Sequence, residues 1–304
     1  MPILTTRQFF AFDTQCTIAI AHERAAELID LCQQHCHNFE HLLSHTNPAS
    51  LVWAINTSAP FERIAVSDDF ADALKASLSF CEKTHGLCDI GLGKLYALWN
   101  WHNAHVPSKE AIEAARKDAG WRRIHVLDGE VWRENRATEV TLGSTAKGWI
   151  ADRLRDDLVD AGVTSAFINL GGNISLIGND PDDLPWRISL AHPTTRKILG
   201  TLHTHDCAIV TSGIGERTFT SHNKHYHHII DPRTGYPAQT DIASITLITP
   251  EGTDADGLST ALLIMGSEQA QKAIADLNET QAIIVLTDGS IITTAGLTFE
   301  AQTT

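Results

Sequence analysis

The stretch TAKGWIADRLRDDLVDAGVTSAFINLGGNISLIG, residues 145–178, changes its pattern of apolar residues half-way along. Its first half has the apolar spacing of a helix, which Gly162 would end. Its second half, from Ser165 to Gly178, has the pattern of a strand, a glycine turn and a second strand. This order departs from a strict strand–helix–strand alternation. It therefore favours an α/β or α+β fold with mixed β-sheets and flanking helices.

The paired glycines of this stretch exclude one common nucleotide site. A dinucleotide-binding fingerprint places its glycines at fixed spacing between a strand and a helix. INLGGNI, residues 168–174, lacks that spacing and leads into a strand. A Rossmann fold is therefore not expected.

The rest of the chain shows the same mixture of elements. Apolar periodicity and capping residues predict helices over 22–44, 68–86, 108–120, 256–266 and 267–277. Strands are expected at 8–21, on both sides of Asp128-Gly129, at 186–190, 208–211 and 244–249, and twice near the C-terminus. We find no repeat, low-complexity tract or linker, so the sequence predicts one domain over residues 1–304.

Composition narrows the classes of protein that this chain can belong to. Its 304 residues are 43% hydrophobic and 20% charged, which is ordinary for a globular protein. A net charge of −14 argues against nucleic-acid binding, which needs a basic patch. No segment approaches the run of about 18 apolar residues that a membrane span needs, and the N-terminus lacks a signal-peptide pattern. The six cysteines show no paired CxxC spacing, so we expect free thiols and a cytoplasmic protein without membrane insertion.

Two segments containing small residues could approach a phosphate group. In LGSTAKGWIAD, residues 142–152, a helix N-terminus and Lys147 would favour an anion. The alternative there is an ordinary N-cap formed by Ser144 or Thr145. In NLGGN, residues 169–173, Gly171 and Gly172 allow positive φ and close approach of a ligand to the backbone. They are equally suited to a tight hairpin.

The segment DADGLSTALLIMG, residues 254–266, could contribute ligands to a cation. In a helix, Asp256 and Thr260 lie one turn apart on the same face. A carboxylate and a hydroxyl in this arrangement can reach one hard cation, with carbonyl and phosphate oxygens completing the coordination. The alternative is an aspartate N-cap and an exposed threonine.

The segment KHYHHIIDPRTGYPA, residues 224–238, combines histidines with a turn. Asp231-Pro232 to Pro237 contains the residues that a tight turn favours. The histidines of this region, at positions 222, 225, 227 and 228, lack a nearby cysteine pair or helical HxxxH spacing, which disfavours a structural zinc. A histidine near an aspartate is better suited to proton transfer close to neutral pH.

In this order, LGSTAKGWIAD, INLGGNI, TSGIGERTF, HHIIDPRTGYP and DADGLSTALLIMG resemble the motifs of the ApbE-type FAD:protein FMN transferase family. GLCDIGLGKLYALWNW and NPASLVWAIN resemble two further segments of that family, and the resemblance runs from about Phe12 to Gly266. It implies a catalytic domain of two packed lobes with the active site in the cleft between them. The implied reaction is Mg²⁺-dependent transfer of FMN from FAD to a serine or threonine hydroxyl of an acceptor flavoprotein, with release of AMP.

The resemblance also implies roles for individual residues. His228 matches the catalytic base, and Asp231 would orient the turn or the histidine. Asp256 and Thr260 would bind the metal with side-chain oxygens and Ala146 with its carbonyl. The positions that fall where the family contacts FAD are Ser50, Asp89, Gly143, Trp149 and Ile230; Lys147, Gly171 and Gly172 join them as cofactor-binding candidates.

Three departures from the family pattern concern the expected FAD contacts rather than the metal or the base. They are Phe12-Asp13 before Thr14, Leu51 after Ser50, and Gly215 before Glu216-Arg217. Many family members are exported lipoproteins, whereas this chain has no lipid-attachment cysteine near its start, so a cytoplasmic acceptor is expected. Two alternatives stay open: an FAD pyrophosphatase that yields FMN and AMP, and a non-catalytic flavin-binding protein.

Overall fold

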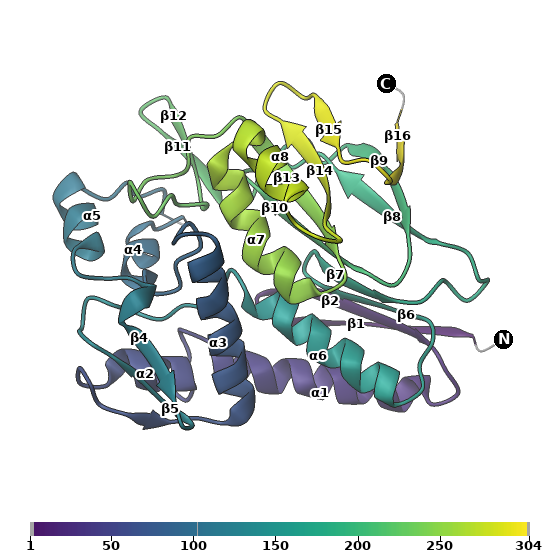
Figure 1. Cartoon of the computed structure of the whole chain (residues 1–304), viewed down its shortest axis with the longest axis horizontal. Coiled ribbons are helices and arrows are strands. Elements are labelled where there is room, and N and C mark those ends of the chain that lie inside the picture. The colour runs from purple at the N-terminus through teal and green to yellow at the C-terminus, as the bar shows by residue number, and fades with distance from the viewer. Residues whose placement is uncertain (1–2, 102, 303–304) are drawn as a thin grey trace. The chain divides into compact units, whose positions relative to one another are not determined.

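The computed structural model describes residues 3–101 and 103–302. The chain forms two compact units, each assembled from separate parts of the sequence. Unit 1 comprises Met1–Glu40, Lys147–Gly213 and Asp241–Thr304, and unit 2 comprises His41–Ala146 and Ile214–Thr240. Figure 1 traces the chain through its helices and strands.

The described residues form α-helices and strands in alternating groups. The helices are α1 (Ala25–Leu43), α2 (Leu51–Thr57), α3 (Asp68–Lys83), α4 (Gly93–Leu98), α5 (Lys109–Arg116), α6 (Ala146–Asp160), α7 (Gly252–Met265) and α8 (Ser267–Ala275), with a 3₁₀ turn at Trp121–Arg123. The strands are β1 (Leu4–Ala11), β2 (Thr14–Ala21), β3 (Ile64–Ala65), β4 (Ile124–Leu127), β5 (Glu130–Arg133), β6 (Ala166–Leu170), β7 (Asn173–Ile177), β8 (Trp186–Ala191), β9 (Ile198–Thr204), β10 (Ala208–Gly213), β11 (Thr218–Ser221), β12 (Lys224–His227), β13 (Ile242–Thr249), β14 (Gln281–Leu286), β15 (Ile291–Thr293) and β16 (Thr298–Ala301).

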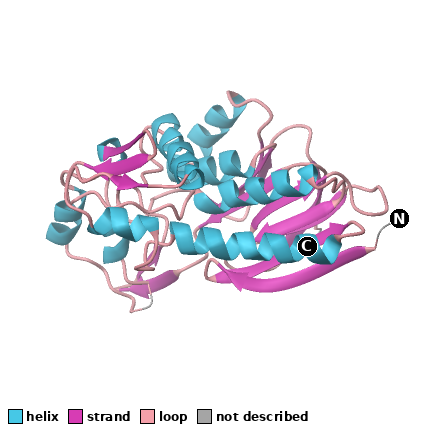
Figure 2. Cartoon of the chain, turned by 90° about the horizontal axis from the view of Figure 1, so that it is seen from below, coloured by secondary structure: helices cyan, strands magenta, loops and turns pink. Residues whose placement is uncertain are grey.

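Unit 1 is built on a sheet with the strand order β1-β2-β6-β7-β10-β13-β14-β15, in which every neighbouring pair is antiparallel. Helices lie against one face of this sheet, as Figure 2 shows. A smaller sheet, β16-β9-β8, packs its apolar side chains against Leu176, Ile209, Ile248 and Ile283 of the large sheet. The predicted α/β class with helices flanking β-sheets is thus confirmed, and the paired strands run antiparallel.

The first segment of the chain is a hairpin, whereas the sequence predicted a single strand over 8–21. β1 and β2 pair from Leu4↔Ala21 to Ala11↔Thr14, so the turn is Phe12-Asp13. Both turn residues have positive φ, 55° and 56°, as a two-residue type I′ turn requires. Such turns usually contain asparagine or glycine, so this one left no signal in the sequence.

Helices α6 and α7 approach each other closely at two glycines. A Cβ on Gly148 would lie 2.2 Å from the carbonyl oxygen of Gly252. The Asp152 carboxylate accepts the backbone N–H groups of Gly252 at 2.6 Å and of Thr253 at 2.7 Å. Because this carboxylate from α6 caps α7, the helix begins at Gly252, one turn before the predicted start at Asp256.

We expect Gly148→Ala to destabilise the protein by about 3 kcal/mol, because the added methyl group must push α6 and α7 apart. The free energy of unfolding, measured by denaturant titration, checks this expectation. Gly143→Ala is the matched control, since the nearest atom to its Cβ would lie 3.9 Å away. Equal stability of the two variants would contradict the close approach.

Unit 2 contains a buried arginine that joins several segments. The Arg133 guanidinium donates to the backbone carbonyls of Ile55, Asn56 and Ser58 at 2.6–2.9 Å. These carbonyls belong to α2 and the residue that follows it, a helix that the sequence analysis did not predict. Burial lowers the pKa of Arg133 from its usual value, although the charge of Glu139 opposes the shift. Arg133 thus supplies hydrogen bonds to carbonyls at the C-terminal end of α2 that lack partners within the helix.

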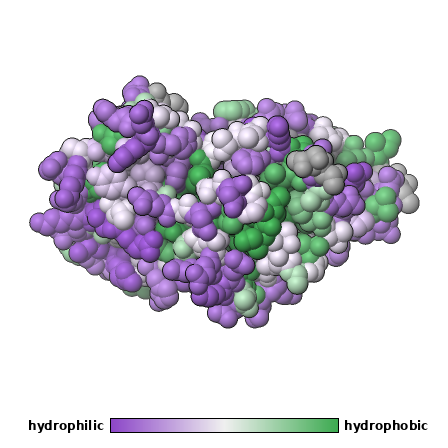
Figure 3. Space-filling view, turned by 90° about the horizontal axis from the view of Figure 1, so that it is seen from above, coloured by the Kyte–Doolittle hydropathy of each residue, from purple (hydrophilic) through white to green (hydrophobic). Residues whose placement is uncertain are grey.

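Other features of the fold agree with the sequence or add to it. The hairpin at Asp128-Gly129 is confirmed, whereas β9, the β11–β12 hairpin and β16 were not predicted. None of the six cysteines, all of which the structure describes, forms a disulfide. Within the described ranges, no helix is both long and apolar enough to span a membrane. Figure 3 shows one face, on which hydrophilic residues are interspersed with smaller apolar areas.

Candidate functional site

Asp256 and Thr260 lie one turn apart in α7, as the sequence predicted. Asp256 is buried, with only 7% of the residue exposed, and its Oδ2 accepts the backbone N–H of Gly148 at 3.0 Å. In the described part of the chain, no lysine, arginine or histidine forms an ion pair with this carboxylate. A buried carboxylate without a cationic partner is costly, and a bound cation would remove that cost.

The other predicted residues near the start of α6 have different surroundings. Ala146 is the first residue of the helix and Lys147 the second. Trp149 is 8% exposed and packs edge-to-face on Phe39, with the ring centroids 5.2 Å apart. Gly143, just before the helix, is exposed. Backbone groups of this segment are therefore more accessible than the Trp149 ring.

The glycine pair of the β6–β7 turn has the conformation that the sequence predicted. Gly171 and Gly172 have φ of 64° and 98°. A Cβ on Gly171 would lie 2.3 Å from Cγ2 of Thr14, so the close neighbour in this structure is the chain itself. Nothing lies within 4 Å of a Cβ on Gly172, which leaves its backbone open to a ligand.

The turn at residues 231–237 is held rigidly within unit 2. The Arg233 side chain donates to both carboxylate oxygens of Asp231, at 2.8–3.2 Å. The Trp99 indole donates to the Gly235 carbonyl at 3.0 Å, and the Arg116 guanidinium to the Pro232 carbonyl at 3.0 Å. Asp231 thus holds the turn through Arg233, and its role in the reaction stays a prediction.

The adjacent histidines of this segment have different environments. His227 is 6% exposed, and burial lowers its pKa to about 4. His228 is half-buried, and its Nδ1 lies 2.8 Å from the Glu216 carbonyl oxygen. Because a carbonyl only accepts, Nδ1 carries the proton and the basic lone pair of the neutral ring is on Nε2. His228, rather than His227, therefore has the geometry of a general base.

Asp89 lines a cavity of about 330 Å³ in unit 2, together with residues 119–123 and Glu134. Its Oδ1 accepts the backbone N–H groups of Gly91 at 2.8 Å and of Trp121 at 2.9 Å. Burial raises the pKa of Asp89 to about 6, although both hydrogen bonds oppose the shift. A carboxyl group titrating near neutral pH in a cavity is a typical feature of a binding site.

Asp89→Asn is expected to stabilise the protein above pH 6. The folded-state pKa of about 6 exceeds the unfolded value of about 4, so ionisation of Asp89 costs up to about 3 kcal/mol, fully incurred above pH 6. The amide oxygen can accept both backbone N–H groups, and the amide does not ionise. Thermal unfolding at pH 7.5 and pH 4 should show a gain for the variant that disappears at the lower pH. Asp72→Asn, at an exposed position of α3, controls for loss of surface charge; a gain independent of pH would contradict the assignment.

Two further predicted FAD contacts have side chains with structural roles. The Ser50 hydroxyl caps α2, accepting the Trp53 N–H at 3.0 Å, and donates to the Ser44 carbonyl at 2.5 Å. Ile230 is 4% exposed in an apolar cluster with Leu95 and Ile112. Any contact of Ile230 with a ligand would therefore come from its backbone.

The donor atoms suit a hard cation rather than zinc. Over residues 3–101 and 103–302, no group of three or more His, Cys, Asp or Glu residues could hold a metal ion. Asp256 and Thr260 supply a carboxylate and a hydroxyl oxygen, which are ligands typical of Mg²⁺. Mg²⁺ commonly takes one or two protein carboxylates together with substrate phosphates, so this donor set fits that ion.

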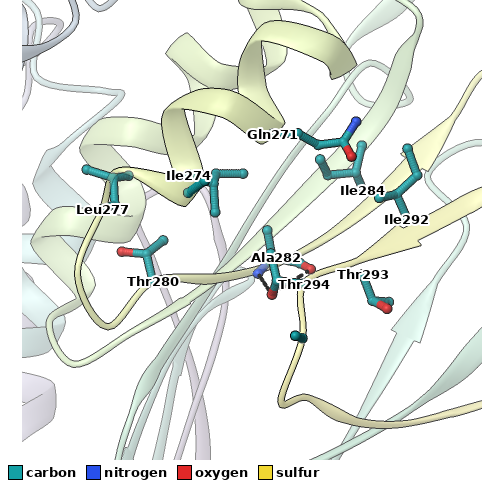
Figure 4. A pocket seen from close by; sticks show the side chains of 11 residues that line it. Gln271, Ile274, Leu277, Thr280, Ala282, Ile284, Ile292, Thr293 and Thr294 are labelled. Carbon is teal, nitrogen blue, oxygen red and sulfur yellow. Dashed lines mark hydrogen bonds between the residues drawn. The ribbon is translucent and has the colours of Figure 1, made fainter.

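A second cavity, of about 380 Å³, lies in unit 1 between α8 and strands β14 and β15. Figure 4 shows Ile274 of α8 and Leu277, just after that helix, on one side and Ile284 and Ile292 of the strands on the other. No side chain that lines it is titratable. It therefore offers no acid, base or charged metal ligand.

Comparison with known proteins identifies the family of the chain. The model of the ApbE family matches residues 12–284. The chain belongs to the ApbE family. The resemblance inferred from the motifs is thus confirmed, over most of the chain.

Individual members of the ApbE family are similar to this chain in sequence and in fold. The chain is 31% identical over 298 residues to the FAD:protein FMN transferase of Treponema pallidum, covering 92% of this chain and 81% of that protein. The fold is similar to that of the ApbE protein from Thermotoga maritima, with a TM-score of 0.88 and 30% identity, covering 96% and 97% of the two chains. It is also similar to the flavin transferase ApbE from Vibrio cholerae, with a TM-score of 0.84 and 25% identity over 96% and 98%.

Several contacts of the candidate residues within each unit were not found by reading the sequence. Gly148 holds Asp256, Asp152 fixes the start of α7, and the Glu216 carbonyl sets the tautomer of His228. Gly148 and Asp152 lie within a segment that the sequence analysis singled out, but their partners are about 100 residues away. Only the tertiary structure brings them together.

Proposed function

We propose that this chain transfers FMN from FAD to a serine or threonine hydroxyl of an acceptor flavoprotein, with Mg²⁺ as cofactor and AMP as leaving group. The observation that carries the proposal is the pair Asp256 and Thr260 on one face of α7, with the buried carboxylate held by Gly148 and lacking a cationic partner among the described residues. The names of the curated relatives support the same reaction.

The cation site uses residues at the α6–α7 crossing. The Asp256 carboxylate and the Thr260 hydroxyl would hold Mg²⁺, and the Ala146 carbonyl would add a third protein ligand. When bound, Mg²⁺ supplies positive charge that offsets the charge of the phosphate oxygens. Gly148 keeps one Asp256 oxygen occupied, so the other would face the cation.

The base and the remaining FAD contacts complete the assignment. The acceptor hydroxyl attacks the phosphorus of the FMN half, the bond from that phosphorus to the bridging oxygen breaks, and AMP leaves with this oxygen. Nε2 of His228 accepts the hydroxyl proton, which is typically worth about 10²–10⁴-fold in rate. Asp231 keeps the turn after His228 rigid. The FAD contacts of the proposal are Ser50, Asp89, Gly143, Lys147, Trp149, Gly171, Gly172 and Ile230.

A direct test is to incubate the protein with FAD, Mg²⁺ and candidate acceptors, and to weigh each acceptor by mass spectrometry. Proteins encoded beside this chain are the first candidates. Transfer adds the mass of one FMN less one water. Release of FMN and AMP at a rate that no acceptor changes would instead indicate an FAD pyrophosphatase. FAD that stays bound and intact would indicate a flavin-binding protein.

A further inference from the structure

Ser212, at the end of β10, connects hydroxyl groups of α7. Its Oγ lies 2.8 Å from Oγ of Ser259 and 3.2 Å from Oγ1 of Thr260. Ser259 is fully buried, and its hydroxyl donates to the carbonyl of Asp256 at 3.3 Å. Three hydroxyls in a row thus run from Thr260 to the backbone of Asp256.

The direction of the hydrogen bonds along this row is determined by its end. A backbone carbonyl only accepts, and a serine hydroxyl has a single proton. Because the Ser259 hydroxyl donates its hydrogen bond to the backbone carbonyl of Asp256, Ser212 must donate to Ser259. The bond between Ser212 and Thr260 then needs the proton of Thr260. The row therefore reads Thr260 to Ser212 to Ser259 to the Asp256 carbonyl.

We infer that Ser212 is a positioning residue for the cation ligand Thr260. A hydroxyl can bind a cation only through an oxygen lone pair, so its proton must point elsewhere. Ser212 accepts the hydrogen bond from the Thr260 hydroxyl, which leaves the oxygen lone pairs of Thr260 for the metal. A cation bound there would polarise the Thr260 O–H bond and strengthen its hydrogen bond to Ser212. This inference rests on the cation site of the proposed function.

The test measures binding of Mn²⁺, a paramagnetic probe for the Mg²⁺ site, in the presence of ADP, which has a diphosphate but no flavin to transfer. Free Mn²⁺ is followed by electron paramagnetic resonance. Removal of an outer-shell partner typically weakens metal binding about 10-fold or more, so we expect Ser212→Ala to raise the Mn²⁺ dissociation constant about 10-fold. Ser212→Thr, which keeps a hydroxyl, should restore much of the affinity.

A double variant separates positioning from a general structural role. Because Ser212 acts through Thr260, Ser212→Ala should weaken Mn²⁺ binding no further in a Thr260→Ala background. Thr211→Ala is the matched control. Thr211 directly precedes Ser212 in β10, and its hydroxyl lies 2.8 Å from that of Thr246. Loss of the Thr211 hydroxyl should leave Mn²⁺ binding unchanged. Additive effects of the Ser212 and Thr260 variants, or wild-type affinity in Ser212→Ala, would overturn the inference while leaving the proposed function intact. If the wild-type protein binds no Mn²⁺, the cation site itself is wrong and the inference falls with it.

Discussion

Asp256→Asn is expected to lower kcat/KM for FMN transfer by about 10³-fold, because charge stabilisation at phosphate oxygens is worth several kcal/mol. The substitution keeps the size of the side chain, and its amide oxygen can still accept the Gly148 N–H. What it removes is the negative charge that would hold the cation. Mn²⁺ affinity should therefore fall together with turnover.

The stability of this variant distinguishes a cation site from a structural carboxylate. Asp256 is a buried residue, and its carboxylate accepts one backbone N–H. Without metal, an uncharged amide at this position should fold at least as stably as the wild type, because it avoids the burial of an unpaired charge. Added Mg²⁺ should then raise the melting temperature of the wild type but not of the variant. Asp254→Asn, two residues earlier in the same helix, is the control for charge on α7. A variant that loses activity only because it unfolds would contradict the role assigned to Asp256.

The spacing of Asp256 and Thr260 could be read from the sequence, because helical periodicity fixes which residues share a face. The start of α7 could not. Local rules favoured Asp256 as a possible N-cap, whereas the cap is the Asp152 carboxylate, which lies 100 residues away from Gly252 in the sequence. Ser212 belonged to the motif TSGIGERTF, but its partners on α7 depend on which helix covers that face of the sheet.

Turns without glycine account for much of what the sequence analysis missed in the fold. The turn between β1 and β2 uses Phe12 and Asp13, and the one between β11 and β12 uses His222 and Asn223, all with positive φ. Their left-handed conformation is imposed by strand pairing on each side. Without a turn signal at His222-Asn223, the sequence did not show that His225 and His227 lie in a strand, and the histidines of residues 222–228 looked like a chemical cluster. His227 and His228 each have a ring nitrogen on a backbone carbonyl, but His227 is buried whereas His228, just after β12, is half-buried.

His228→Asn is expected to lower the transfer rate by about 10²–10⁴-fold, the usual contribution of a general base. Asparagine can place its amide N–H near the position of Nδ1–H and preserve the hydrogen bond to the Glu216 carbonyl. It has no counterpart of the basic Nε2. The affinity for FAD should therefore stay within a few-fold of the wild type, and loss would appear in the chemical step.

Single-turnover kinetics with saturating FAD and acceptor measure that step directly. His225→Asn, three residues earlier on an exposed position of β12, controls for removal of a histidine from the same segment. His228→Gln is the complementary variant, because its longer amide reaches toward Nε2 and gives up the contact with Glu216. If the asparagine variant retained the wild-type rate, the proton of the acceptor hydroxyl would have to leave by another route. The tautomer set by Glu216 would then be a feature of the turn and not of the reaction.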